Sequence, residues 1–190
     1  FVLGTICGVC HLLPFDIAET NISYYALCAL MFSVGLSVGN DPQTLKNFRS
    51  LNPRLVFLPI MTILGTLAGS AAVSLILTHR SITDCLAVGS GFGYYSLSSI
   101  FITEYKGAEL GTIALLANIS REILTLLAAP LLVRWFGNLA PISAGGATTM
   151  DTTLPIITRT AGQQFVVVSI FHGFVVDFSV PFLVTLFCSI

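Results

Sequence analysis

The sequence predicts an all-α fold: a polytopic transmembrane helical bundle in which two helices are discontinuous, either broken or re-entrant, as in secondary transporters. Of its 190 residues, 55% are hydrophobic and 9% are charged, against roughly 25% charged in an average soluble domain. Several apolar runs reach the length of about 20 residues that a helix needs to cross a hydrocarbon core about 30 Å thick. Two further runs are long enough to cross but are interrupted by glycine, proline and hydroxyl residues. We therefore expect one transmembrane transporter domain over residues 1–190.

Charge and cysteine usage argue against two other classes of protein. The net charge is −1, and no cluster of Lys or Arg provides the basic surface that nucleic-acid binding requires. The five cysteines include one C-x-x-C pair, Cys7 and Cys10, which in principle could be a redox or metal pair. No second C-x-x-C and no βαβ pattern accompanies it, and buried cysteine usually behaves as a small apolar side chain. We expect no cofactor, no metal site and no nucleic-acid partner.

The start of the chain holds one short apolar run and one that is long enough for a membrane helix. The first run, 1–15, has no basic segment before it and does not resemble a signal peptide. We expect it to be the end of a longer helix or a short interfacial segment. Residues 22–38 are expected to form a membrane helix, which Gly39 and Pro42 end. Residues 41–54 hold three of the eight basic residues, and the positive-inside rule places this loop in the cytoplasm.

Three runs are typical of ordinary membrane spans. Residues 55–78 carry no formal charge and include small residues that allow close helix contact. Residues 110–133 are apolar at both ends, and two adjacent charges fall at their centre. Residues 165–190 are apolar apart from one histidine and one aspartate, and Gly173 and Pro181 are expected to kink this helix.

Two other runs are expected to be discontinuous. Residues 84–104 contain a series of glycines and serines at their centre, and each glycine weakens a helix by about 1 kcal/mol relative to Ala. Irregular backbone is tolerated in a bilayer only where protein buries it or where it lines a cavity, so a broken helix is favoured here. A glycine-rich nucleotide loop is the alternative, but no strand signal precedes it and no Lys follows it. Residues 137–160, with Pro141 and Pro155 around a Gly-Gly pair, predict a second discontinuous or re-entrant segment.

Charged residues inside the apolar runs are the candidate functional residues, because a charge at mid-membrane costs roughly 2.5–3.5 kcal/mol and usually faces a partner or a wet cavity. Glu122 lies mid-span, and Asp151 lies among four threonines whose hydroxyls could help to coordinate a cation. The alternative for Arg121 and Glu122 is an ion pair that locks helices together, although adjacent helix positions do not face each other. For His172 and Asp177 a site role and a structural role both stay open, and their five-residue spacing places them on different faces of a helix.

The predicted site combines acidic, hydroxyl, aromatic and basic side chains from these segments. Its candidate substrate- and ion-binding residues are Glu122, Asp151, Asp177, Arg121, Asn118, Ser120, Tyr95, Ser96, Ser98, Thr149, Thr152 and His172. Acidic groups favour a cationic substrate, and a desolvated carboxylate can take up a proton in its place. Two interrupted segments separated by an ordinary helix favour a carrier over a simple pore. We therefore expect the exchange of a cationic substrate for a proton or a sodium ion.

Four ordered blocks of sequence carry a family resemblance. They are GSGFGYYSLSS (89–99), ANISREI (117–123), GGATTMDTTLPII (145–157) and the FHG that begins at Phe171. With these blocks the chain resembles the bacterial lysine exporter LysO family from about Leu27 to its end. The resemblance implies export of L-lysine and its toxic analogue thialysine across the bacterial inner membrane by a multi-pass protein. It also implies that an intramembrane acid pair, matching Glu122 and Asp151, is required for transport.

The resemblance and the residues together favour a secondary active exporter of a cationic amino acid that works by proton antiport. Longer members of the family have further N-terminal membrane helices, so a homo-oligomer or a separate N-terminal subunit is expected as a partner, beside membrane lipid. The alternative is a channel or membrane subunit that functions only with a separate polypeptide. An intramembrane enzyme is disfavoured, because no nucleophile elbow and no H-E-x-x-H metal motif occurs in the sequence.

Overall fold

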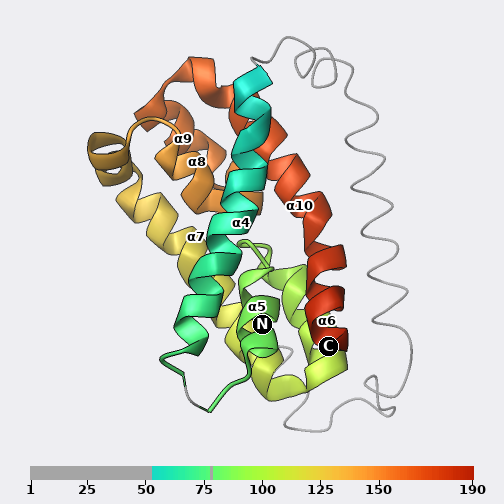
Figure 1. Cartoon of the computed structure of the whole chain (residues 1–190). Helices are drawn as coiled ribbons and strands as arrows, with labels where there is room; N and C mark the ends of the chain where they lie inside the picture. The colour runs from blue at the N-terminus through green and yellow to red at the C-terminus, as the bar shows by residue number, and fades with distance from the viewer. Residues whose placement is uncertain (1–52, 78) are drawn as a thin grey trace, which may run out of the picture. The chain divides into compact units, whose positions relative to one another are not determined.

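The computed structural model describes residues 53–77 and 79–190, which belong to one compact unit of the chain. All regular elements of this part are helical, and three of them are long and apolar enough to cross a membrane (Figure 1). The three are α4 (Phe57–Ser74), α7 (Ala108–Phe136) and α10 (Val166–Ser189). Their positions confirm the three long apolar helices that the sequence predicts as ordinary spans. The expected helix over 22–38, the C-x-x-C pair and most of the basic loop lie outside the described residues.

The long helices expose apolar side chains as membrane spans do. A short 3-10 helix, η2 (Pro53–Val56), leads into α4, on which Phe57, Met61 and Leu64 are more than half exposed. Helix α7 likewise exposes Leu124 and Leu127. Such a surface is too apolar for water, and it fits a lipid environment.

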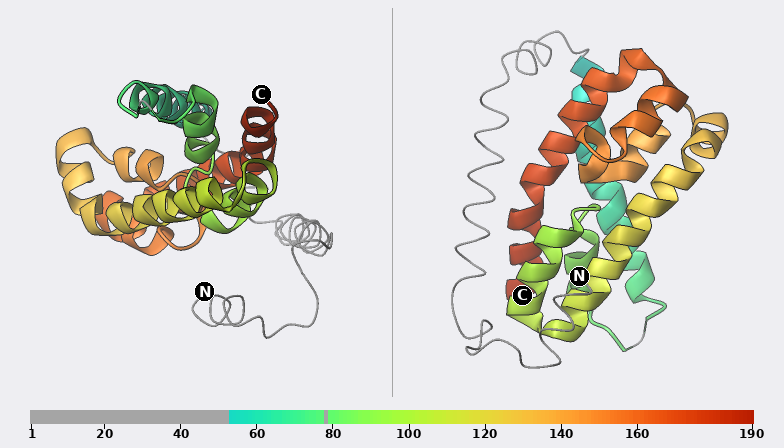
Figure 2. Two further views of the ribbon diagram at one scale, coloured as in Figure 1. Left: turned by 90° about the horizontal axis from the view of Figure 1, so that it is seen from below. Right: turned by 180° about the vertical axis from the view of Figure 1, so that it is seen from behind.

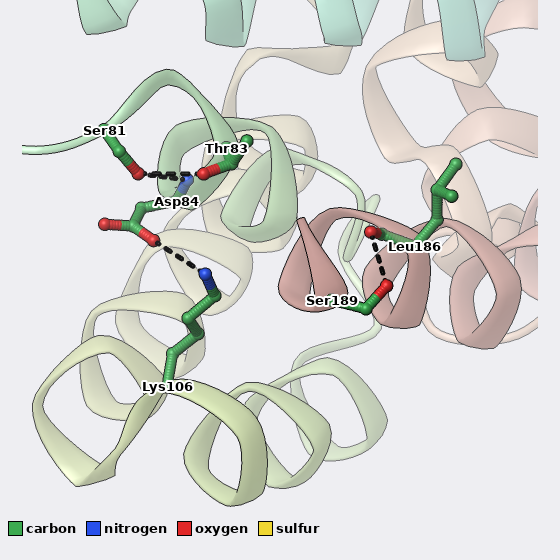
Figure 3. A network of polar contacts seen from close by, with 6 residues as sticks. All are labelled: Ser81, Thr83, Asp84, Lys106, Leu186 and Ser189. Carbon is green, nitrogen blue, oxygen red and sulfur yellow. Dashed lines mark hydrogen bonds and ion pairs between the residues drawn. The ribbon is translucent and has the colours of Figure 1, made fainter.

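Between α4 and α7 the chain forms a helical hairpin, here called hairpin 1 (82–106), from α5 (Ile82–Gly89) and α6 (Tyr95–Lys106). Ser81 caps α5 by accepting a hydrogen bond from the backbone of Asp84 at 3.1 Å. The Nζ atom of Lys106 lies 4.0 Å from a carboxylate oxygen of Asp84 (Figure 3), so the first turn of α5 meets the last turn of α6. A helix that continued through these residues would hold its ends more than roughly 30 Å apart. The helix over 84–104 is interrupted between Gly89 and Tyr95, and at this interruption the segment turns back to the side from which it starts.

Between α7 and α10 the chain forms a second hairpin, hairpin 2 (140–161), which has three short elements. These are α8 (Ala140–Gly145), the 3-10 helix η3 (Gly146–Met150) and α9 (Leu154–Ala161), and the 3-10 helix η4 (Gln163–Phe165) then leads into α10. Ile142 of α8 packs against Ile157 and Ala161 of α9 and Val168 of α10 in one buried apolar cluster. The start of α8 and the end of α9 therefore lie together.

The two hairpins open toward opposite ends of this unit and meet at their tips. Helix α7 begins where Glu109 pairs with Arg80 beside hairpin 1, and it ends where Val133 joins the apolar cluster of hairpin 2. Helix α10 runs the other way, so α5–α6–α7 and α8–α9–α10 are each a hairpin followed by a long helix. Figures 1 and 2 show α5 and α6 in one half of this unit and α8 and α9 in the other. The tips join through a hydrogen bond of 2.9 Å from the backbone N–H of Ala147 to the carbonyl oxygen of Phe92.

Candidate functional site

The tips of the two hairpins can touch because glycines line the contact between them. Gly146 has a φ of +64°, and a Cβ at this position would overlap the carbonyl oxygen of Phe92. Gly93 has a φ of +95°, and a Cβ there would lie 3.2 Å from the carbonyl oxygen of Gly145. Only glycine combines the left-handed conformation with so close a backbone approach. The Gly-Gly pair and the glycine-rich block that the sequence singled out are therefore where the two hairpins touch.

Asn118 of α7 supports the tip of hairpin 1. Its side chain is 3% exposed, and its Oδ1 atom accepts a hydrogen bond of 2.8 Å from the N–H of Gly93. Its Nδ2 atom donates to the carbonyls of Val88 and Ala114 at 3.2 and 2.9 Å. The hydroxyl of Ser98 donates to the carbonyl of Tyr94 at 2.8 Å. Both predicted site residues thus hydrogen-bond to backbone at or beside the tip of hairpin 1.

Arg121 of α7 caps the end of α8. Its guanidinium donates to the carbonyl oxygens of Ala144 and Ser143 at 2.8 and 3.1 Å and to the hydroxyl of Thr66 on α4 at 3.4 Å. The same group lies 5.9 Å from the ring centroid of Phe92, in cation–π range. Within the described residues Arg121 forms no ion pair. A positive charge beside the last carbonyls of a helix is favourable, and here it links α4, α7 and both hairpins.

His172 and Thr149 form a second buried support, at the tip of hairpin 2. The hydroxyl of Thr149 donates to the carbonyls of Gly146 and Ser169 at 2.8 and 3.0 Å and lies 3.2 Å from Nδ1 of His172. The Nε2 atom of His172 lies 2.9 Å from the hydroxyl of Thr62 on α4. His172 is fully buried, so this chain of contacts ties α10, η3 and α4 together.

Two carboxylates and a phenol gather beside the tips. Asp151 follows η3, is exposed, and accepts hydrogen bonds from the N–H and hydroxyl of Thr152 at 2.5 and 3.3 Å. Asp177 of α10 is 5% exposed. It lies one turn beyond Gly173, where a Cβ would lie 2.7 Å from the backbone nitrogen of Met150. Asp151 and Asp177 interact electrostatically with each other, and both act on the hydroxyl of Tyr94.

Glu122 lies mid-way along α7 and is half-buried. It makes no ion pair with Arg121, as the adjacent helix positions predict, and no hydrogen bond to any residue of the described part. Within the described residues, no hydrogen bond or ion pair joins it to Asp151. The predicted acid pair is thus placed on α7 and on hairpin 2 without a direct link, while Asp151 and Asp177 are brought together.

The other predicted residues lie around the hairpin tips. Tyr95 and Ser96 begin α6, where Tyr95 is half-buried and Ser96 is exposed. Ser120 is exposed on α7 and lines a cavity of about 460 Å³ that Arg121 also lines. A cavity of about 570 Å³ between α4, α5 and α7 reaches from Asn118 to Asp84, and a third, of about 340 Å³, lies between α4 and α8. None of the three acids Glu122, Asp151 and Asp177 lines these cavities, and no three His, Cys, Asp or Glu side chains of residues 53–77 and 79–190 could hold a metal ion.

Two residues of the candidate site were not predicted from the sequence. Tyr94 lies in the glycine-rich block beside the predicted Tyr95, and nothing in the pattern says which of two adjacent tyrosines faces the acids. Thr62 is an isolated hydroxyl in an apolar span, where hydroxyls commonly bond to their own helix. Only its burial on a lipid-facing helix distinguishes Thr62 from such hydroxyls. Burial depends on the neighbouring helix, so it could not be predicted from this span alone.

Two opposed hairpins, three helices that are candidate membrane spans and two acids beside the hairpin tips define a helical protein of the membrane-transporter type with polar groups at its centre. The family model described as "Lysine exporter LysO" matches residues 1–188, and the chain belongs to this family. It is a family of exporters and not of enzymes. The family that the sequence blocks resemble is thereby confirmed.

Two relatives extend the comparison. The chain is 37% identical over 188 residues to "Lysine exporter LysO" of Escherichia coli, covering 99% of this chain and 62% of that protein. It is 36% identical over 188 residues to "Putative lysine exporter" of Haemophilus influenzae, covering 92% of that protein. The chain therefore spans about 62% of the first relative's length. No solved structure matches the chain.

Proposed function

We propose that this protein is a secondary active exporter of a cationic amino acid, with L-lysine and thialysine as substrates, and that it works by proton antiport in the bacterial inner membrane. The family description and the names of both relatives support lysine as the substrate. The observation that carries the proposal is the position of Asp151 and Asp177 at the meeting point of two opposed hairpins. Carboxylates without a cation from the protein suit a cationic substrate.

The helix ends at the hairpin tips also support a cationic amino acid as the substrate. The ends of α5 and α8 meet Asn118 and Arg121, which satisfy their carbonyls. The starts of α6 and α9 lie on the side of the acids, since Tyr94 precedes α6 and Asp151 precedes α9. Helix starts carry partial positive charge and can hold the carboxylate of an amino acid while the acids hold its ammonium groups. One site would then accept both ends of a zwitterion.

The hairpins also provide a route for alternating access. In many secondary transporters, discontinuous elements from two inverted repeats meet at the midplane, and one repeat rocks against the other around the site. Here the hairpin-then-helix unit occurs twice in opposite directions. We infer that hairpins 1 and 2 are the discontinuous membrane segments of this transporter, and that Glu122 and Asp151 bind substrate and proton in turn.

The distribution of basic residues supports an orientation. Arg54, Arg134 and Arg159 lie at the end of the unit toward which hairpin 2 opens, whereas Arg80 and Lys106 lie at the other end and pair with acids. Arg54 also ends the basic stretch 41–54. The positive-inside rule then places the open end of hairpin 2 in the cytoplasm.

A labelling experiment tests this orientation. Ala108→Cys and Asn138→Cys, both at exposed positions, are made separately in a cysteine-free background. An impermeant maleimide added to intact cells, with the outer membrane permeabilised where present, should label Ala108→Cys and should label Asn138→Cys only after lysis. The reverse pattern would place hairpin 2 on the outside.

Solute counterflow tests the proposed function. The full chain is reconstituted in vesicles that are loaded with unlabelled lysine, and uptake of labelled lysine is followed with arginine, ornithine or sodium salts as competitors. Lysine should accumulate transiently above its equilibrium level, and Glu122→Gln and Asp151→Asn should each lower the rate at least about tenfold, which corresponds to about 1.4 kcal/mol. Downhill flux without counterflow would favour a channel, and lysine counterflow that survives both substitutions would overturn the acid-pair mechanism.

A further inference from the structure

Asp177 is the buried charge that the hairpin contacts leave without a partner. Its side chain is 5% exposed, and within residues 53–77 and 79–190 it accepts no hydrogen bond and joins no ion pair. Two other buried polar side chains at this level do have such partners, since Asn118 bonds to hairpin 1 and His172 to Thr149, whereas the neutral hydroxyl of Ser169 has none among the described residues. An ionised carboxylate in such surroundings is costly unless a proton or a cation neutralises it.

The groups that face Asp177 come from both hairpins. Asp151 acts on it from the end of η3, and Tyr94, which precedes α6, is acted on by both carboxylates. Three other titratable groups on or beside α10 have interactions elsewhere. His172 is held between Thr149 and Thr62, and Asp84 and Lys106 act on Cys188 near the other end of α10. No cation of the described residues offsets the charge of Asp177.

The two carboxylates differ in access. Asp151 is exposed and its carboxylate accepts two hydrogen bonds from Thr152, whereas Asp177 is buried and accepts none. Two carboxylates that share a site resist being charged together. When no substrate is bound, the state in which the pair carries one proton is therefore favoured. Of the two, the buried group without hydrogen bonds is the one that needs this proton.

We propose that Asp177 carries the proton that is exchanged for the substrate, and that Asp151 is the carboxylate that the substrate's ammonium group meets first. This inference rests on the proposed export of a cationic amino acid, and it assigns the proton to Asp177 rather than to Glu122 or Asp151, which keep the role of binding the substrate. When the ammonium group binds between the carboxylates, the O–H bond of Asp177 breaks and the proton passes to water on the cytoplasmic side. After the substrate leaves on the outer side, a proton from that side binds Asp177 again. Each cycle then moves one proton inward for each substrate cation outward.

The test separates the proton step from substrate binding. Asp177→Asn in the reconstituted full chain is compared with the unchanged protein in two assays, lysine counterflow at equal pH on both sides and lysine transport driven by a pH gradient. Counterflow exchanges substrate for substrate and needs no proton, so it should fall less than gradient-driven transport, although the ammonium group loses the charge of Asp177. Gradient-driven transport should fall at least about tenfold and lose its dependence on the gradient, and Asp177→Glu should restore part of it.

Matched variants and outcomes keep the inference falsifiable. Asp84→Asn makes the same chemical change at the open end of hairpin 1, and it should leave both assays unaltered. Equal losses of counterflow and gradient-driven transport in Asp177→Asn would overturn the inference, as would gradient-driven transport at the rate of the unchanged protein. If the unchanged protein shows lysine counterflow but no response to a pH gradient, the inference fails, while lysine is still the substrate. If it shows no lysine counterflow at all, the proposed function fails.

Discussion

The two hairpins have the same outline but are held together in different ways. Hairpin 1 closes at its open end with the ion pair between Asp84 and Lys106, and next to it Arg80 pairs with Glu109. Hairpin 2 closes with an apolar cluster around Ile142. The difference shows that the hairpin shape depends on the tip contact and on the long helices, whereas the open ends can be closed by either kind of interaction.

The tips differ in what they contribute to the polar centre. The backbone of hairpin 1 is satisfied by Asn118, a side chain from the helix that follows it. The backbone of hairpin 2 is satisfied largely by its own threonines, since Thr148 and Thr153 bond to carbonyls within the tip. Hairpin 2 also carries Asp151, and hairpin 1 carries no acid at its tip. Hairpin 1 is therefore the scaffold of the site, and hairpin 2 brings the charge.

The largest effect is expected where the two tips touch. Gly146→Ala places a methyl group against the carbonyl of Phe92 and also strains a residue whose φ is +64°, a strain that alone costs roughly 1–2 kcal/mol. The tips must separate, so the variant should lose the monodisperse peak on size-exclusion chromatography in detergent. Gly137→Ala is the matched control, because its φ is +86° but nothing lies within 4 Å of the added Cβ. If both variants behave alike, the tip contact is not what holds the hairpins.

The second effect concerns the cation that spans both hairpins. Arg121→Met removes the donors to the carbonyls of Ser143 and Ala144, and each buried polar group left unsatisfied costs roughly 1–3 kcal/mol. We expect a loss of about 2–5 kcal/mol in the free energy of unfolding, measured as a lower melting temperature in detergent with a thiol-reactive dye. Arg134→Met, an exposed arginine in the last turn of the same helix, should change it by less than about 0.5 kcal/mol. Equal melting temperatures for the two variants would show that Arg121 is not a structural link.

Periodicity and composition predicted the long helices well and the hairpins only in part. The span over 110–133 and α7 agree to within a few residues at each end, since an unbroken apolar run leaves one solution in a bilayer. The glycines of 84–104 correctly mark an interruption, but glycine disfavours helix without saying whether the chain continues or returns. That choice is made by contacts of the tip with Asn118 and with hairpin 2, which a local pattern does not contain.

The candidate site shows the same limit. Mid-membrane position marked Asp151 and Asp177 because charge in an apolar run needs a reason. It could not tell that Asn118 and Arg121 bond to backbone carbonyls while Asp177 bonds to nothing in the described part of the chain. A polar side chain that stabilises an interrupted helix and one that waits for a ligand have the same sequence signal, and only their partners distinguish them.

A smaller effect is expected at the open end of hairpin 2. Ile157 is fully buried in the apolar cluster, and Ile→Ala substitutions in protein cores cost about 2–5 kcal/mol. Helix contacts in a membrane lack most of the hydrophobic driving force between helices, so for Ile157→Ala we expect the lower end, about 2 kcal/mol. Denaturation with sodium dodecyl sulfate against a background of mild detergent measures it. Ile123→Ala, at an exposed position on α7, is the control, and an equal loss there would show that the cluster contributes nothing specific.

The smallest effect is expected at the open end of hairpin 1. The ion pair between Asp84 and Lys106 is 4.0 Å long and both side chains are partly exposed, and such pairs are worth about 0–1 kcal/mol. Asp84→Asn should therefore change the melting temperature in detergent by no more than a few degrees, and the change should shrink as salt is added because salt screens exposed charges. The hairpin keeps its shape because its tip is fixed by Asn118 and by the contact with hairpin 2. A loss as large as that of Ile157→Ala would mean that charge holds hairpin 1 closed as firmly as apolar packing holds hairpin 2.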